Sequence, residues 1–202
     1  MDEVNSSRSA ILSDEIERAR AQEYILLATL LAKAPDSDLL ARLASLDGND
    51  SALGIAHAAL AAAAADTRQD KVDREFSDLF IGVGRGELLP YGSYYLSGAL
   101  NDRPLARLRT DLARLGIART QVCGEPEDHA AILCEIMASL IDGRFDTSFG
   151  ADRDMFEKHI APWMGRFFAD LEQAQAAHFY RSVGRIGRCF IEIEGEAFKL
   201  AA

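Results

Sequence analysis

The sequence predicts an all-α fold, a helical bundle, on three observations. Alanine is abundant, only 5 of 202 residues are proline and 49% are hydrophobic, a composition that favours helices over strands. Apolar residues recur at steps of three and four along most of the chain. No run alternates polar and apolar residues with period two over the length of a strand. The length suits one sizeable domain, or two small parts that share a core.

Four helices are expected in the first 82 residues. They are residues 14–33, 36–46, 51–66 and 67–82. The first has a broad apolar face and ends before Pro35, and Asp36 or Ser37 caps the second. The third is rich in alanine, which allows close helix packing. The buried stripe of the fourth is predicted to be Val72, Phe76, Leu79 and Phe80.

The rest of the chain is predicted to hold four further helical segments. These are residues 103–117, 127–143, 154–174 with a break near Pro162, and 176–194. Between them, residues 86–98, GELLPYGSYYLSG, are expected to be non-helical although they carry three tyrosines. A non-periodic stretch with glycine and proline follows residue 117. It predicts a hinge near 121–129 between an N-terminal part, 1–120, and a C-terminal part, 121–202, packed as one compact unit.

The charge balance excludes a general nucleic-acid binder. The 22 basic and 32 acidic residues give a net charge of −10, whereas such a protein needs a basic footprint. Cys123, Cys134 and Cys189 have no paired spacing, which indicates free thiols in a reducing compartment. We see neither a signal-peptide pattern nor an apolar run long enough to span a bilayer. A cytoplasmic protein without stable membrane insertion is therefore expected.

The sequence does not assemble an active site. Histidines and cysteines lack zinc-type spacing, and the GVGRG of residues 82–86 lacks the Lys-Ser/Thr of a phosphate loop. Asp128 and His129 are unusual because they head the apolar stripe of the helix predicted at 127–143. A structural hydrogen-bonding role at the hinge and a ligand-contact role both explain that position. An acid–base pair is a third reading.

Three short motifs occur in order along the chain. They are Leu79-Phe80-x-Gly82, Pro90-Tyr91-x-Ser93-x-Tyr95 and Glu125-Pro126-x-Asp128-His129. With the later APWMGRFFADLE, they make residues 20–195 resemble the TorD/DmsD family of redox-enzyme maturation chaperones. Tyr91 stands where some members have tryptophan, a change that affects the client rather than the family.

The resemblance implies an all-helical TorD-like fold, no enzymatic activity, no cofactor or metal of its own and a cytoplasmic location. Members bind the catalytic subunit of a molybdoenzyme, often through its twin-arginine signal peptide, until cofactor insertion is complete. Residues 79–91, LFIGVGRGELLPY, look most like members with formate-dehydrogenase-type clients. Some members form homodimers by exchanging domains across the hinge, which makes residues 121–129 a candidate exchange point.

A twin-arginine peptide has a cationic head and an apolar stretch, so its receptor should offer carboxylates and an apolar groove. The candidate client-binding residues are Leu89, Pro90, Tyr91, Ser93, Tyr95, Glu125, Asp128 and His129. Further carboxylates near the two motifs are Glu87, Asp102 and Glu127. Two alternatives stay open: a structural helical interaction module, and an enzyme that uses Asp128 and His129 as an acid–base pair.

Overall fold

The computed structural model describes residues 2–118, 124–148 and 150–200, with the backbone alone for 2–11 and 13. These residues form helices and no strands, as the composition predicts. The elements are α1 (Asp2–Ala32), α2 (Ser37–Leu43), α3 (Ala52–Ala65), α4 (Gln69–Phe76), the π-helix η1 (Ser77–Ile81), α5 (Gly92–Ser97), α6 (Arg103–Arg114), α7 (Ala130–Ile141), α8 (Ala151–Met155), the π-helix η2 (Phe156–Ile160), α9 (Met164–Gln173) and α10 (Phe179–Leu200).

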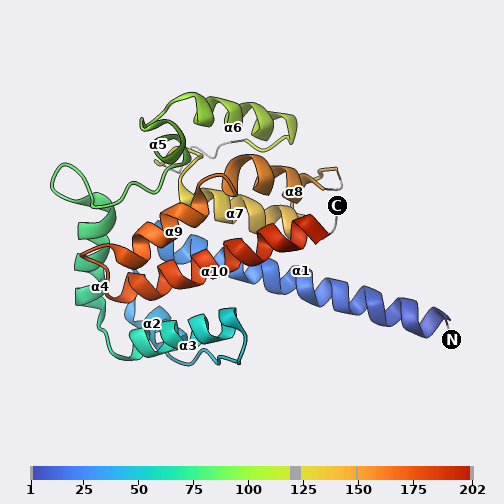
Figure 1. The fold of residues 1–202 in the computed structure, drawn as a ribbon, viewed down its shortest axis with the longest axis horizontal. Coiled ribbons are helices and arrows are strands. Elements are labelled where there is room, and N and C mark those ends of the chain that lie inside the picture. Colours follow the sequence, from blue (N-terminus) through green and yellow to red (C-terminus); the bar gives the residue numbers. More distant parts are fainter. Residues whose placement is uncertain (1, 119–123, 149, 201–202) are drawn as a thin grey trace.

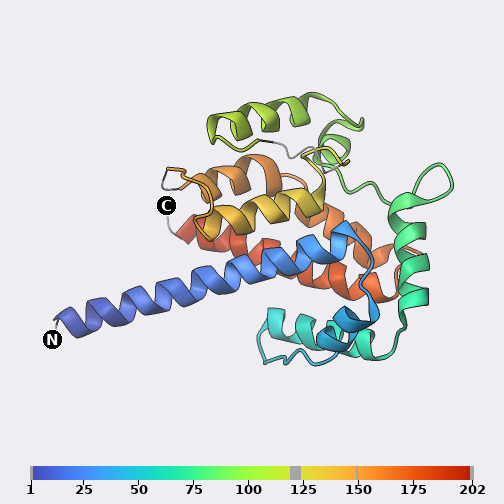
Figure 2. The same ribbon diagram turned by 180° about the vertical axis from the view of Figure 1, so that it is seen from behind.

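The centre of the bundle is built from helices of both ends of the chain. α1 packs along α7, and α10 packs against both α9 and α3 (Figures 1 and 2). Figure 1 shows α2 and α3 covering one end of this core and α5 and α6 covering the other, while α4 stands at one side. Among the largest fully buried side chains are Tyr24, Phe167, Phe168 and Tyr180. Residues from Tyr24 to Ile191 thus contribute to one core, and the division into parts 1–120 and 121–202 stays a prediction.

The predicted starts of α1 and α7 are wrong, for identifiable reasons. α1 begins at Asp2 instead of residue 14, and its first half extends beyond the body of the molecule (Figure 2). No glycine or proline interrupts residues 2–13, so the helix continues through this polar stretch. α7 begins at Ala130 rather than 127, because the side chain of His129 caps it and the preceding residues form a turn.

The expectation that residues 86–98 contain no helix is also wrong, since Gly92–Ser97 forms α5. Its first turn is supported from outside: the Gly92 amide donates to the Asp128 carbonyl and the Ser93 amide to the Asp128 carboxylate. Gly98, in the left-handed region at φ 79°, ends the helix. A Cβ at Gly92 would meet the Trp163 ring at 3.0 Å, so a larger residue here would require that ring to shift.

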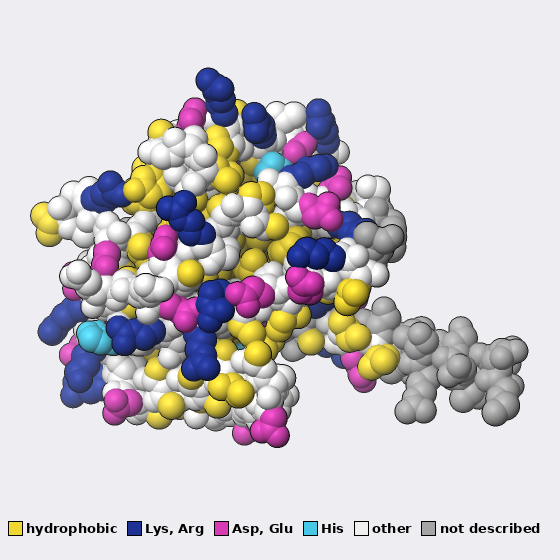
Figure 3. Space-filling model, in the orientation of Figure 1, with side chains coloured by type: hydrophobic (Ala, Val, Ile, Leu, Met, Phe, Trp, Pro, Cys, Tyr) yellow, Lys and Arg dark blue, Asp and Glu magenta, His cyan; other side chains and the backbone are white. Residues whose placement is uncertain are grey.

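The surface of the described residues mixes charges of both signs. In Figure 3 acidic and basic side chains are interspersed, and Lys and Arg side chains gather along the α6 edge. No helix in the described ranges is long and apolar enough to cross a membrane. Cys134 and Cys189 are buried free thiols. Cys123 and the rest of the predicted hinge before Gly124 lie outside the described residues, so the exchange dimer stays a prediction.

Candidate functional site

The second and third sequence motifs meet in space. Tyr91 and His129 form an isolated antiparallel bridge, in which the Gly92 amide donates to the Asp128 carbonyl at 2.9 Å and the Ala130 amide to the Pro90 carbonyl at 2.8 Å. Two segments that are distant in the sequence are therefore held side by side by backbone hydrogen bonds.

The buried side chain of Asp128 stabilises this junction. Its carboxylate accepts the Ser93 amide at 2.7 Å, and both residues are buried. A charged acceptor on the first turn of α5 favours that helix. Asp128 and Ser93 therefore position the junction and offer little surface to a bound molecule.

His129 serves as the N-cap of α7 in its neutral form. Its Nδ1 accepts the Ala131 amide at 3.1 Å, which requires an unprotonated nitrogen. Burial lowers the pKa of His129 below its ordinary 6.5, against the opposing effect of the Glu125 and Asp128 carboxylates. The imidazole also packs edge-on against the Tyr91 ring, with 5.1 Å between centroids.

Tyr91 ties the junction to the surface. Its hydroxyl donates to Glu125 Oε2 at 2.6 Å, while its ring is half-buried. Burial, together with the hydrogen bond to this carboxylate, raises the pKa of Tyr91 well above 10, so the phenol stays protonated. Glu125 itself is exposed.

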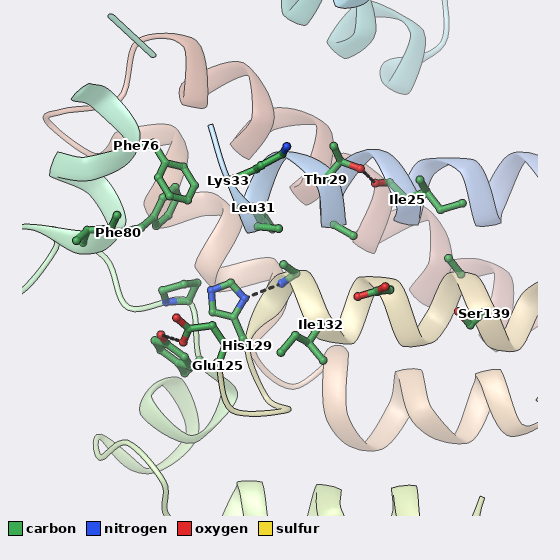
Figure 4. Close-up of a pocket in the computed structure, with 18 of the residues that line it drawn as sticks. Ile25, Thr29, Leu31, Lys33, Phe76, Phe80, Glu125, His129, Ile132 and Ser139 are labelled. Carbon is green, nitrogen blue, oxygen red and sulfur yellow. Dashed lines mark hydrogen bonds between the residues drawn. The ribbon is translucent and has the colours of Figure 1, made fainter. Parts of the chain in front are cut away.

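Tyr91, Glu125 and His129 form one end of a groove that runs between α1 and α7 (Figure 4). Its volume is about 770 Å³. The apolar lining is Ile25, Ala28, Leu31, Ala32, Phe76, Phe80, Ile81, Pro90, Ala131, Ile132 and Ala138. The polar lining beyond the junction is Thr29, Lys33, Glu135, Ser139 and Arg144.

A second depression of about 310 Å³ continues the groove on the other side of α7. The two share Glu125, Ile132, Glu135 and Ser139 as lining residues. The second is walled by α6 and carries three carboxylates, Glu125, Glu127 and Glu135, against one cation, Arg109. Arg109 pairs with Glu127 at 2.8 Å, whereas exposed Glu135 has no side-chain partner among the described residues.

The structure divides the predicted site residues into three groups. Pro90, Tyr91, Glu125 and His129 line the groove. Ser93 and Asp128 lie buried under it. Leu89 and Tyr95 lie outside it.

Tyr95 is held on the far side of the junction by α9. It packs on Trp163 and Phe167 and donates its hydroxyl to Asp170 at 2.9 Å. The predicted carboxylate Glu87 is likewise engaged elsewhere, because it accepts the amides of Gln175 and Ala176.

Several groove residues escaped the sequence analysis. Phe76 and Phe80 are not in the buried stripe predicted for them but are half-buried and line the groove. For Phe80 the cause is the π-turn η1, where Gly82 donates to Ser77 five residues back and displaces the helical register. Ile25 and Glu135 carried no signal because both read as ordinary positions of amphipathic helices.

The arrangement suits binding better than catalysis. His129 Nδ1 is committed to the helix cap, and the Asp128 carboxylate to Ser93. Burial raises the pKa of the Cys134 thiol, which keeps it unreactive. Within the described ranges, no group of three or more His, Cys, Asp or Glu side chains is placed to hold a metal.

Known proteins share both the sequence and the fold. The family model of the nitrate reductase delta subunit matches residues 46–169. The chaperone protein TorD of Vibrio cholerae is 27% identical over 199 residues, covering 88% of this chain and 90% of its own. TorD of Aliivibrio fischeri is 27% identical over 136 residues, 62% of this chain and 63% of its own. The crystal structure of a redox enzyme maturation protein from Archaeoglobus fulgidus superposes with a TM-score of 0.56 at 21% identity, over 86% of this chain and 93% of its own, a likeness of fold.

These matches confirm the resemblance first seen in the three motifs. The relatives are named chaperones, and the role they share is not enzymatic, which leaves the acid–base reading of Asp128 and His129 without support. The chain belongs to the nitrate reductase delta subunit family, the TorD-like chaperones of redox-enzyme maturation.

Proposed function

We propose that this chain is a cytoplasmic chaperone that holds the catalytic subunit of a molybdoenzyme, by its twin-arginine signal peptide, until cofactor insertion is complete. The observation that supports the proposal is the continuous groove over α7. It is apolar on the α1 side and rich in carboxylates on the α6 side.

The apolar part of the groove fits the apolar stretch of such a leader. Ile25 is 41% exposed and Ile81 is 61% exposed, so a bound apolar segment would remove both from water. Phe76 and Phe80 lie together at one end, beside the end of α1 at Lys33 (Figure 4). Aromatic side chains give large contact area for little lost rotamer entropy.

The carboxylates of the second depression fit the cationic head of the leader. Guanidinium groups form paired hydrogen bonds with carboxylates, and a Lys ammonium does not reproduce that geometry. Glu135 stands where the two depressions meet, so a peptide that follows the groove passes it. Tyr91 would orient Glu125 from below through its 2.6 Å hydrogen bond.

A formate-dehydrogenase-type client remains the proposed partner class, on the residues around the Leu79-Phe80-x-Gly82 motif. The catalytic subunit of such an enzyme and its isolated leader are therefore the first ligands to test.

The test titrates the full chain against a fluorescent twin-arginine leader, the Lys-Lys version of that leader, and the catalytic subunit itself. We expect saturable binding of the Arg-Arg leader. The Lys-Lys leader should bind about tenfold more weakly, because it loses one charge-assisted pair of hydrogen bonds. Glu135→Gln should lower the affinity for the Arg-Arg leader about five- to tenfold. Ile25→Asp should weaken both leaders alike, because it places a charge in the apolar part.

Matched controls lie elsewhere on the surface. Ile55, on α3, is 47% exposed and lines no part of the groove, so Ile55→Asp should bind like the unmodified chain. Glu196→Gln, on α10, is the control for Glu135→Gln and should also bind like the unmodified chain. The absence of saturable binding to the leader and to any full-length molybdoenzyme subunit would remove the proposal. Binding that Glu135→Gln and Ile25→Asp leave unchanged would move the site away from this groove.

A further inference from the structure

We propose that a cleft between α6 and the turn at Pro162 binds a short acidic segment of a protein partner. The cleft has a volume of about 850 Å³ and shares no lining residue with the groove over α7. It is lined by Leu96, Ser97, Asp102, Arg103, Pro104, Arg107, Thr110, Asp111, Arg114, Lys158, His159 and Pro162.

The cleft has the opposite charge balance to the protein. Four Lys or Arg side chains line it against two carboxylates, Asp102 and Asp111, in a chain whose net charge is −10. The groove over α7, by contrast, is lined by two cations and two carboxylates. Its neighbouring depression is lined by one cation and three carboxylates. A basic excess in a cleft of an acidic protein favours an anionic occupant.

The carboxylates inside the cleft leave much of this charge uncompensated. Asp111 is shared between Arg114 at 2.9 Å and His159 at 2.9 Å. Lys158 pairs with Asp154 but stays 53% exposed. Arg103 and Arg107 are exposed and make no side-chain ion pair with any described residue.

The layout of the cations favours an extended segment. Arg103, Arg107 and Arg114 are four and seven residues apart, so they share one face of α6 and span about 16 Å at 1.5 Å per residue. An extended peptide covers that span with about five residues. Lys158, on η2, adds a cation from the opposite wall. A compact phosphate ligand would need the cations to converge on one point instead.

The charge outside the cleft selects against a long polyanion. A nucleic acid would extend past α6 onto a chain with ten more acidic than basic residues, where its phosphates are repelled. A short run of Asp and Glu in a protein avoids that repulsion. The cleft therefore supplies a second contact to a partner, independent of the groove that takes the leader.

The test uses the full chain and a fluorescent peptide of about eight Asp and Glu residues, with its Asn/Gln counterpart, at about 50 mM salt. We expect saturable binding of the acidic peptide only, weakening as salt is raised. The double variant Arg103→Glu/Arg107→Glu should lose at least about tenfold in affinity. Its melting temperature should be unchanged, because both side chains are exposed, and so should its affinity for a twin-arginine leader.

Arg181→Glu/Arg185→Glu is the matched control. Both arginines are exposed and spaced four apart on α10, but the cleft that Arg181 lines has no basic excess, since Lys71, Arg74 and Arg181 stand against Asp66, Glu75 and Asp78. This variant should bind within about twofold of the unmodified chain. Equal losses in the two double variants, or no saturable binding of the acidic peptide, would overturn the proposal. So would tighter binding of a single-stranded oligonucleotide through Arg103 and Arg107, which would assign the cleft to nucleic acid.

Discussion

At the scale of single residues, His129 is where the site depends on a protonation state. Its Nδ1 caps α7 only while it carries no proton, and a protonated ring would leave the Ala131 amide facing a second donor. The folded state therefore holds the pKa of this imidazole below that of the unfolded chain.

The chain should lose stability as the pH falls below the ordinary pKa of histidine. Above about pH 6.5 the imidazole is neutral in both states and its full contribution is present. As pH falls from 6.5 toward the lowered pKa of the folded state, the unfolded chain binds the proton first and stability declines. We expect this decline between pH 6.5 and 5 to be smaller in His129→Asn, where the side chain still caps the helix but does not titrate. Urea unfolding at several pH values measures it.

His57 provides the opposite control. The hydrogen bond that His57 donates to the Glu23 carboxylate raises the pKa of His57, so its contribution is present below pH 6.5 and is lost as pH rises through the raised value. His57→Gln should therefore lose stability mainly on the acidic side. If the unmodified chain and His129→Asn follow parallel stability curves from pH 8 to 5, His129 is not held neutral.

The sequence predicted some of these residues and not others, for physical reasons. Asp128 and His129 stood out because polar residues at the head of an apolar stripe need partners, and the structure gives one to His129 Nδ1 and to one of the two Asp128 carboxylate oxygens. Glu135 did not, because a glutamate on the outer face of a helix is the commonest arrangement there is. Its place at the join of two depressions depends on α1 and α6, which are distant in sequence.

At the scale of elements, the start of α10 shows how a helix of the N-terminal part orders one of the C-terminal part. The Glu75 carboxylate of α4 accepts the amides of His178, Phe179 and Tyr180 at 2.8, 3.1 and 2.7 Å. The residue is buried, so this carboxylate replaces water for three amides at the positive end of a 22-residue helix.

We expect Glu75→Gln to lower the free energy of unfolding by about 1–2 kcal/mol, because it keeps an acceptor but loses the charge. Glu75→Ala should cost about 2–4 kcal/mol, since the buried amides of Phe179 and Tyr180 and the part-buried amide of His178 lose their partner. Denaturant unfolding measures both. Glu196→Ala, at an exposed position of α10, should stay within about 0.5 kcal/mol of the unmodified chain. Equal stability of Glu75→Ala and Glu196→Ala would show that water satisfies these amides instead.

The sequence predicted those helices in which the apolar repeat continues over many residues, such as α6 and α10. α5 was not, because six residues carry too little periodicity and its first turn depends on Asp128, 35 residues away. The two π-turns were equally hidden, and one of them carries Phe80 and Ile81 to the groove.

At the scale of the whole molecule, α1 forms one wall of the groove and is fixed to the body by a charged junction. Arg20 donates to both carboxylate oxygens of Glu194, at 2.7 and 2.8 Å, and to Asp152 at 3.3 Å. Tyr24 donates to the same Glu194 carboxylate at 3.2 Å. Glu194 is 1% exposed, so its charge is stable only while Arg20 compensates it.

Removing one partner of this junction should therefore cost more than removing both. Arg20→Met leaves a buried, unpaired carboxylate and should destabilise the chain by about 3–5 kcal/mol. Arg20→Met/Glu194→Met replaces the pair by apolar side chains and should recover at least about half of that loss, with Tyr24 left to find another acceptor. Denaturant unfolding of the two single variants and the double variant gives the coupling energy.

Because α1 carries Ile25 and Thr29 into the groove, Arg20→Met should also lower the affinity for the leader, and the double variant should restore that affinity. Strictly additive losses would mean that Arg20 and Glu194 stabilise the fold separately, and that the position of α1 over the groove is set by its apolar contact with α7 alone.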